Sequence, residues 1–270
     1  MLPLNDGDVI RYRIGYACEY DQYTWIHTGE AFRGIKRFKE FLASIKTTLE
    51  EETEDKTYVK ESIIDPVDHC LHSVKETINF IRRRVGSYSC VTYLTGTGNF
   101  REKIATIQPY KGNRPDRKPV HYDAITDYLI YKYKAIVVDG MEADDAMAIY
   151  QSSFPDTCIV TIDKDLLQVP GDHYNFVSDK FHHTTPWEGL QRLYQQILTG
   201  DTTDNILGIP KIGPAKAKAW LEGCTTEKEL YKRACELYKQ ERGDNWHDEL
   251  VETARLVYML RHPTDEWSPP

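Results

Sequence analysis

Segments with the apolar pattern of β-strands alternate with segments with the pattern of α-helices from residue 88 onward. This alternation restricts the possible folds more than any other feature of the sequence. The runs at Ala135–Val138 and Thr157–Ile162 are apolar on both faces of an extended chain. Strands of this kind are typical of a parallel sheet that helices cover on each side. The sequence therefore predicts an α/β fold with a mainly parallel central sheet.

Apolar spacing also places the other expected elements. The expected strands contain Leu2 and Leu4 or span residues 89–94, 135–138, 157–162 and 173–177, and the expected helices span 9–17, 32–49, 67–85, 120–132, 143–151 and 186–198. Gly and Pro residues at 208–214 mark a change to a helical region that begins at Ala215. We therefore expect an α/β core at 1–198, interrupted by a helical insertion at about 18–88, and a helical region at 199–270.

The insertion carries no recognisable motif. Its two amphipathic helices either pack over one face of the sheet or contact DNA or a partner, and only Lys36, Arg37 and Lys39 favour the second interpretation. The charged stretch at 50–60 is expected to be a loop or a frayed helix.

Net charge and composition limit the expected cellular location of the protein and the kinds of partner that it could bind. The chain has 34 Lys and Arg against 42 Asp and Glu, a formal net charge of −8, which argues against a nucleic-acid partner. No apolar run approaches the ~18 residues of a membrane span, and the amino terminus lacks the pattern of a signal peptide. The six cysteines are scattered, without a C-x-x-C pair, which favours reduced thiols. We expect a cytoplasmic protein without a membrane partner.

The acidic residues are not spread evenly but gather where expected strands end. They are Asp6; Glu142, Asp144 and Asp145; Asp163 and Asp165; and Asp201 and Asp204. Ligand sites of open α/β sheets lie outside the carboxyl ends of the strands. Carboxylates without His or Cys at ligand spacing suit Mg²⁺ or Mn²⁺, and two such ions about 4 Å apart can hold both oxygens of a phosphoryl displacement. The alternative is a helix N-terminus at which the helix dipole stabilises acids.

A basic and aromatic stretch could complement these acids. It comprises Asn99–Arg101 and Tyr110–Lys118. Tyrosine can stack on a base, and Lys and Arg can stabilise the charge of a phosphate. The alternative is an ordinary solvated basic loop.

Five short motifs follow one another in order. They are Asp6-Gly7; Phe100-Arg101 with Tyr110–Arg114; Glu142–Asp145; Thr161–Leu166; and Gly200–Ile206 continuing into Gly208–Ala217. In this order they resemble the 5′ nuclease superfamily, which contains flap endonucleases, phage 5′-to-3′ exonucleases and the amino-terminal 5′ nuclease domain of bacterial DNA polymerase I. The resemblance extends from Asp6 to about Leu221, and each motif alone is commonplace.

The resemblance implies a role for each matching residue. Asp6, Glu142, Asp144 and Asp145 match acids of a first metal site, and Asp163, Asp165, Asp201 and Asp204 match acids nearer a second metal. Lys111 and Arg114 match a catalytic basic pair, Tyr110 matches an aromatic that stacks on a nucleotide, and Arg101 is assigned to DNA binding with it. Gly208, Lys211, Gly213 and Lys216 match a helix-hairpin-helix-type loop that holds duplex DNA, often through K⁺.

The implied function is a two-metal 5′-to-3′ exonuclease or flap endonuclease that hydrolyses DNA near 5′ ends, flaps, nicks or forks. A chain of this size resembles the free-standing phage enzymes, which implies a role in replication, recombination or DNA degradation in a host cytoplasm. Two alternatives stay open: an RNase H-like 5′ nuclease acting on RNA primers, RNA-DNA hybrids or structured RNA, and a catalytically weakened structure-specific DNA-binding protein. The second arises because the family usually has an Asp where residues 93–100 contain no acid, with Asp8 as a candidate replacement.

Overall fold

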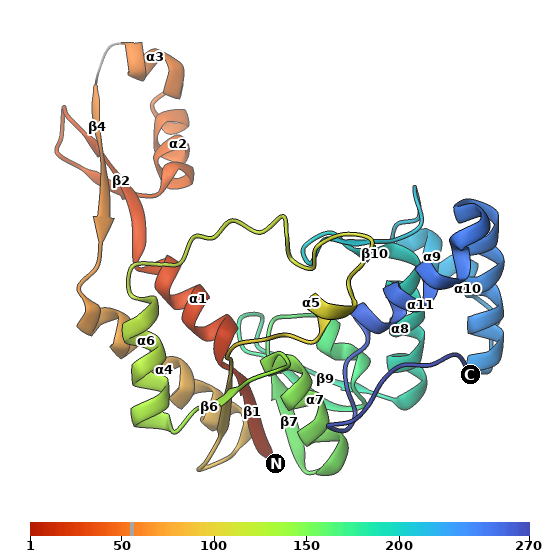
Figure 1. The fold of residues 1–270 in the computed structure, drawn as a ribbon. Coiled ribbons are helices and arrows are strands. Elements are labelled where there is room, and N and C mark those ends of the chain that lie inside the picture. The colour runs from red at the N-terminus through yellow and green to blue at the C-terminus, as the bar shows by residue number, and fades with distance from the viewer. Residues whose placement is uncertain (55–56) are drawn as a thin grey trace. The chain divides into compact units, whose positions relative to one another are not determined.

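The computed structural model describes residues 1–54 and 57–270, and it divides the chain into two compact units (Figure 1). Unit 1 comprises Met1–Val9, Asn79–Asp116 and Leu129–Pro270, and unit 2 comprises Ile10–Ile78 and Arg117–Tyr128. The helices α1 (Gly7–Ala17), α4 (Val67–Val85) and α6 (Tyr122–Tyr133) each contribute residues to both units. The proposed functional boundary between residues 198 and 199 stays a prediction.

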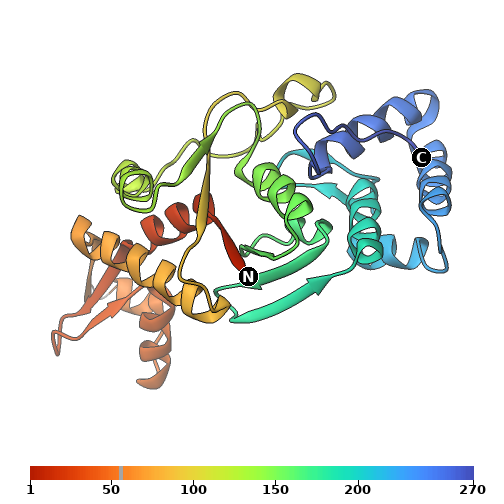
Figure 2. The same cartoon turned by 90° about the horizontal axis from the view of Figure 1, so that it is seen from below.

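Unit 1 contains a six-stranded sheet with the strand order β6-β5-β1-β7-β8-β9 (Figure 2). Its strands are β1 (Leu2–Asp6), β5 (Val91–Thr95), β6 (Ile136–Val138), β7 (Thr157–Val160), β8 (Gly171–Asn175) and β9 (Lys180–Thr184). All neighbouring strands are parallel except β8 and β9. The predicted α/β class with a mainly parallel sheet is confirmed. The antiparallel edge strand β9 was not predicted, because its sequence Lys-Phe-His-His-Thr lacks an apolar run. In the structure, most residues of this strand are exposed.

The apolar run at 157–162 forms the buried central strand β7, as predicted, whereas the run at 135–138 forms the edge strand β6, in which Ile136 and Val137 are exposed. Every residue of β7 is buried, and Leu4 of β1 packs in a cluster with Ile159 of β7 and Met147. Met147 lies on α7 (Ala143–Ser153), which covers this part of the sheet. At the end of β1 the chain passes so close to β5 that a Cβ on Gly7 would lie 2.4 Å from the carbonyl oxygen of Tyr93. This position therefore requires glycine, and it fixes the place of the preceding Asp6.

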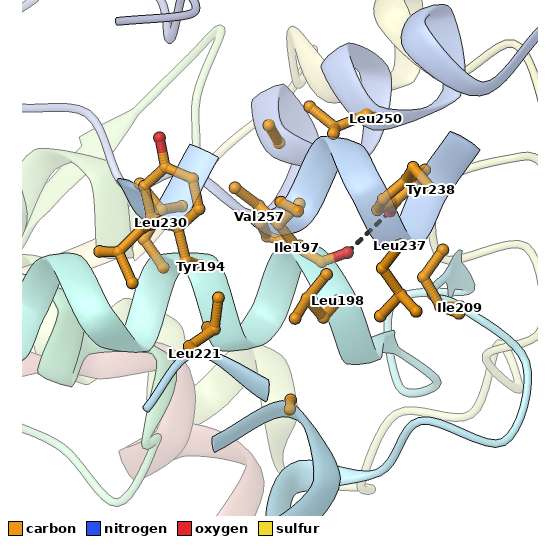
Figure 3. Packing of buried hydrophobic residues seen from close by; sticks show 14 of the residues in the cluster. Tyr194, Ile197, Leu198, Ile209, Leu221, Leu230, Leu237, Tyr238, Leu250 and Val257 are labelled. Atoms are coloured by element: carbon orange, nitrogen blue, oxygen red, sulfur yellow. Dashed lines mark hydrogen bonds between the residues drawn. The ribbon is translucent and has the colours of Figure 1, made fainter. Parts of the chain in front are cut away.

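The carboxyl-terminal part of unit 1 is helical, as predicted. It contains α8 (Pro186–Thr199), the strands β10 (Gly200–Asp201) and β11 (Ile206–Leu207), and the helices α9 (Pro214–Trp220), α10 (Glu227–Arg242) and α11 (Trp246–Val257), with the 3-10 helix η2 (Gly243–Asn245). Buried side chains of α8, α10 and α11 form one core, in which the Tyr238 hydroxyl donates to the Ile197 carbonyl at 2.7 Å (Figure 3). In the described part of the chain, no helix has the length and apolar character to cross a membrane.

Unit 2 corrects the prediction that the insertion at about 18–88 consists of two amphipathic helices and a charged loop or frayed helix, because it also contains strands. It contains an antiparallel sheet of β3 (Ala31–Arg33), β2 (Glu19–Trp25) and β4 (Tyr58–Ile64), with the helices α2 (Ile35–Ser44) and α3 (Leu49–Glu54). Tyr23, Trp25 and Phe38 form an aromatic core between the sheet and α2. The helix expected at 32–49 begins only after Gly34, whose φ of 81° interrupts it. Residues 55–56 of the charged stretch lie outside the described residues.

Candidate metal and nucleic-acid site

Asp6 lies at the carboxyl end of β1 and is 2% exposed. Its carboxylate accepts hydrogen bonds from the Val9 backbone N–H at 2.9 Å and from the Thr161 hydroxyl at 2.7 Å. Burial, followed by the nearby charge of Asp8, raises the pKa of Asp6 to about 7. Two protein donors therefore do not fully compensate the charge of this carboxylate.

A second group of acids begins α7, beyond the end of β6. Glu142 is the N-cap residue and forms a capping box with Asp145. Burial raises the pKa of Asp144 well above its ordinary value, and the charges of Asp6 and Asp163 raise it further. The structure thus brings the acids that follow β1, β6 and β7 close together, as their positions at the strand ends predicted.

Asp163 and Asp165 lie after β7, where Asp165 begins the 3-10 helix η1 (Asp165–Gln168). The Asp163 carboxylate accepts from the backbone N–H of Asp165 at 2.8 Å, and the Asp165 carboxylate accepts from the Gln196 side chain at 2.6 Å. Burial raises the pKa of both carboxyls, that of Asp165 to about 8, with Asp163 as its next cause. The charge of Asp201 contributes to both pKa shifts, so β10 lies near this group.

The last two acids belong to the turn that joins β10 and β11. One oxygen of Asp201 accepts from the backbone N–H of Asp204 at 3.3 Å. The Asp204 carbonyl accepts from the backbone N–H of Lys111 at 2.8 Å, and the Asn113 side chain donates to the carbonyl of Thr202 at 2.7 Å. The basic stretch is therefore attached to the acidic turn by backbone as well as side-chain contacts.

Three side chains of the basic stretch reach the acids. The Tyr110 hydroxyl lies 2.9 Å from a carboxylate oxygen of Glu142 and 2.7 Å from one of Asp204. Lys111 donates to Glu142 and lies 3.7 Å from Asp204, and Arg114 donates to Asp204. Burial and the neighbouring Glu142 raise the pKa of the Tyr110 phenol. The structure thus places the predicted catalytic pair and the predicted aromatic at the acidic site.

Arg101 occupies a different environment from the one its assignment to DNA binding requires. It is 1% exposed and forms a buried ion pair with Asp145. Its guanidinium also donates to the carbonyls of Leu256 and Tyr258, at 2.8 Å each. Burial alone would lower the pKa of Arg101, but Asp145 raises it above the ordinary value. The structure therefore places Arg101 and Asp145 in the interior, where neither a DNA strand nor a metal reaches them without displacing this pair.

The proposed duplex-binding loop is partly exposed and partly packed. A Cβ on Gly208 would lie 2.0 Å from the backbone of Thr199, so Gly208 permits a close approach within the fold. Gly213 has no atom within 4 Å of its would-be Cβ, and Lys211 and Lys216 are exposed. The Lys216 amine donates to the Lys211 carbonyl at 3.1 Å. Gly213 and the two lysines therefore remain available to a ligand. Gly208, in contrast, is required for the close packing of the chain against Thr199.

The chemistry of the acidic site fits a divalent cation. Four of the acids form no salt bridge within the described residues: Asp6, Asp144, Asp163 and Asp165. Burial and mutual repulsion raise the pKa of each of these carboxyls. Clustered carboxylate oxygens that have no positively charged partner are suited to binding Mg²⁺ or Mn²⁺. In residues 1–54 and 57–270, no three Asp, Glu, His or Cys side chains already surround one point as metal ligands. The acids therefore lie near one another, but in the described residues they do not have the geometry of a complete metal site.

Two polar residues hold the acids in place: Asp8, which the sequence offered as a candidate replacement for the missing acid, and Thr95, which sequence reasoning missed. Both Asp8 carboxylate oxygens accept from the backbone N–H of Thr95 at 3.3 Å, and the Thr95 hydroxyl accepts from the backbone N–H of Ala143. Asp8 thus links the end of β5, where the family's usual Asp is absent, to the other acids. Its position two residues after Asp6 was the available signal.

The sequence comparisons give relatives with two names, DNA polymerase I and 5′-3′ exonuclease. The chain is 33% identical over 154 residues to DNA polymerase I of Rhizobium leguminosarum, a match covering 50% of this chain and 15% of that protein. It is 27% identical over 179 residues to a 5′-3′ exonuclease of Mycoplasma genitalium, covering 57% of this chain and 60% of that protein. The chain thus spans less than two thirds of the length of these relatives. No family model matches it.

Solved structures extend the likeness to the fold. The T5 5′-exonuclease with bound zinc ions covers 95% of this chain at a TM-score of 0.55 and 15% identity, over 88% of its own chain. The bacteriophage T5 flap endonuclease in complex with DNA and metal ions covers 95% of this chain at a TM-score of 0.54, over 88% of its own. At this identity the likeness concerns the fold alone. The comparisons together support the resemblance to the 5′ nuclease superfamily that the ordered motifs indicated.

Proposed function

We propose that this chain is a divalent-metal-dependent 5′-to-3′ exonuclease or flap endonuclease that hydrolyses phosphodiester bonds near the 5′ ends of DNA. One observation carries the proposal: buried carboxylates from four strand ends lie together beside Tyr110, Lys111 and Arg114. A cluster of acids requires cations, and a bound cation attracts the phosphate that free carboxylates would repel. The names of the sequence relatives and of the T5 structures agree with this activity.

Asp6, Glu142 and Asp144 are the side chains that we assign to a first metal, with Asp8 in place of the family's missing acid. A second metal would be held by Asp163, Asp165, Asp201 and Asp204. Bound Mg²⁺ or Mn²⁺ would activate the nucleophile and offset the charge that develops on the phosphate. Asp145 stays bound to Arg101 in this assignment and orients α7, on which Asp144 lies.

Lys111 and Arg114 act directly on the substrate in this proposal. Without a substrate their side chains bond to Glu142 and Asp204. Arg114 is about half exposed and Lys111 about one quarter, so both can contact a phosphate at the rim of the site. Their positive charges would stabilise the charge that accumulates in the transition state. Tyr110, which forms one wall of the site, would orient the adjacent nucleotide.

Duplex binding would use the exposed loop around Gly213. Lys211 and Lys216 supply positive charge for the phosphate backbone, and Gly213 lets the backbone approach it closely. A K⁺ ion at this loop is part of the proposal. The biological role that we propose is removal of 5′ flaps or primers during replication, or DNA degradation, by a phage-encoded enzyme.

The decisive experiment is digestion of an end-labelled 5′-flap duplex and a nicked duplex, with Mg²⁺ and with EDTA. We expect short 5′ products only with Mg²⁺, and none from the Asp144→Asn variant. A matched flap of RNA distinguishes the ribonuclease alternative by its relative rate. Tight binding of forked DNA in Mg²⁺ without any product would overturn the proposal in favour of a binding protein.

A further inference from the structure

The carboxyl-terminal end of α4 carries a hollow that the nuclease site does not use. The hollow has a volume of about 400 Å³ and is lined by Asn79, Arg82, Arg83, Gly86, Ser87 and Tyr88, all in unit 1. These residues precede β5, whereas the acids lie beyond the opposite end of that strand. A strand of five residues spans about 16 Å, so the hollow is separate from the acidic site.

Two of the three arginines at the end of α4, both of which line this hollow, have no acidic partner among the described residues. Arg82, Arg83 and Arg84 form the last turn of α4. Arg84 pairs with Asp179 at 2.7 Å, but Arg82 and Arg83 form no salt bridge within the described residues. The Arg82 Nε is shielded from solvent and has no hydrogen-bond partner among these residues. A buried donor without a partner is costly. The guanidinium of Arg82, which lines the hollow, therefore has hydrogen-bonding capacity that the described residues do not use.

The backbone holds the hollow open at the end of the helix. Gly86 adopts a φ of 72°, and the Ser87 N–H donates to the Arg82 carbonyl at 2.9 Å. This C-cap turns the chain away from the helix axis and places Tyr88 beside the arginines. Tyr88 is 96% exposed, and its ring is free to stack on a planar group.

We propose that this hollow is a second anion site, which binds the phosphate of a nucleotide between Arg82 and Arg83 while the base stacks on Tyr88. Guanidinium groups bind phosphate through charge-assisted, paired hydrogen bonds. The volume lies within the range of about 300–1,000 Å³ that is common for small-ligand sites. A free mononucleotide and an internal nucleotide of a single strand share this chemistry.

Calorimetric titration of the full chain in EDTA tests the site without cleavage. The probes are deoxyadenosine monophosphate, inorganic phosphate, deoxyadenosine and a short oligodeoxyadenylate that lacks terminal phosphates. We expect Arg82→Gln and Arg83→Gln each to weaken binding of the monophosphate by about 10-fold or more. Tyr88→Leu should weaken the monophosphate by about 10-fold and leave inorganic phosphate unchanged.

Arg84→Gln is the matched control, because it removes the same charge from the same helical turn but from outside the hollow. Equal weakening by Arg84→Gln, or no weakening by Arg82→Gln and Arg83→Gln, would overturn the proposal. The exposed Arg83 keeps the test valid if the Arg82 variant does not fold. Tighter binding of the monophosphate than of the oligonucleotide identifies a free nucleotide as the source, and the reverse identifies a single strand.

Discussion

Lys111 is the residue on which the proposed chemistry depends most directly. Its amine lies at both Glu142 and Asp204, and the backbone φ of 55° fixes its unusual position in the loop. We expect Lys111→Ala to lower the single-turnover cleavage rate by about 100-fold, because it removes a charge that acts in the transition state. Binding of flap DNA should change much less.

The exposed Lys103 on α5 (Arg101–Ile104) provides the control for charge. Lys103→Ala should retain the parental single-turnover rate. If Lys111→Ala also kept that rate, and lost only affinity, Lys111 would be a binding residue and its assigned role would be wrong.

The buried pair of Arg101 and Asp145 stabilises the fold around the site. Arg101→Met leaves Asp145 as an unpaired buried charge, which costs about 3–5 kcal/mol in the free energy of unfolding. Combining it with Asp145→Leu removes both charges, so the double variant should be more stable than Arg101→Met alone. Urea unfolding of the parent, of Arg101→Met, of Asp145→Leu and of the double variant measures this coupling. Strictly additive effects would show that the pair does not interact energetically.

His173 on β8 should make the stability depend on pH. It is 4% exposed, its Nε2 bonds to the Val169 carbonyl at 2.8 Å, and its Nδ1 has no partner among the described residues. Burial lowers its pKa to about 4, although the hydrogen bond to Val169 and the charge of Asp172 oppose this shift; nearby His182 of β9 and Arg192 of α8 add to the lowering. A lowered histidine pKa gives stability that is present above the unfolded-state pKa and lost as the pH falls from about 6.5 to 4.

The loss over this pH interval should reach about 3 kcal/mol in the free energy of unfolding. His173→Gln should remove this part of the pH dependence, whereas His183→Gln, on exposed β9, should keep it. Urea unfolding at pH 4.5, 5.5 and 6.5 measures the slope. Parallel slopes for the parent and His173→Gln would contradict the assignment.

At the scale of residues, the sequence predicted which acids lie together. It did not predict which of these acids pair with a positively charged side chain inside the protein. Asp144 and Asp145 are adjacent and equally acidic in the sequence. Only the folded chain brings Arg101 to Asp145, 44 residues further along the sequence, and brings the carbonyls of Leu256 and Tyr258, more than 150 residues away, to Arg101. Such a distant contact has no local pattern, so the sequence could not show that Arg101 is buried against Asp145.

At the scale of elements, the loop from β11 to α9 separates structural from functional glycines. Gly208→Ala should destabilise the protein, because its Cβ would overlap the Thr199 backbone. Gly213→Ala should leave the melting temperature unchanged, since its φ of −94° suits alanine and the space around it is open. If this loop approaches DNA, Gly213→Ala should nevertheless weaken duplex binding several-fold. Unchanged duplex affinity would remove Gly213 from the proposed interface.

Elements with strong local signals were predicted well, and elements that depend on distant pairing were not. The α4 helix spans Val67–Val85 as expected, because Asp65-Pro66 marks its beginning and apolar residues follow at steps of three and four. In contrast, β2 pairs with β4 from a distance of more than 30 residues. Its alternation of polar and aromatic residues becomes informative only when α2 covers one face.

At the scale of the whole molecule, the distribution of charge matters more than its sum. The eight candidate metal-site acids equal in number the formal net charge of −8. The same charge that argued against nucleic acid is thus concentrated where a cation is needed. Exposed basic residues at Lys211 and Lys216 lie elsewhere in unit 1. Net charge alone therefore could not identify the partner.

This concentration of acids predicts that divalent cations stabilise the entire unit 1. A cation that binds only the folded state adds about 2.7 kcal/mol at 100 times its dissociation constant, which raises the melting temperature by several degrees. We expect Mg²⁺ to raise, and EDTA to lower, the melting temperature of the full chain. Asp144→Asn should itself relieve repulsion and raise the metal-free melting temperature, while reducing the shift that Mg²⁺ produces.

Sodium chloride at matched ionic strength separates specific binding from screening, because salt weakens exposed repulsion without occupying a site. Asp8→Asn then tests whether this chain compensates for the acid missing from residues 93–100. If Asp8 lies in the first metal site, its loss should raise the Mg²⁺ concentration needed for a given thermal shift. An unchanged concentration would place Asp8 outside the metal site and leave its bond to Thr95 as a structural contact.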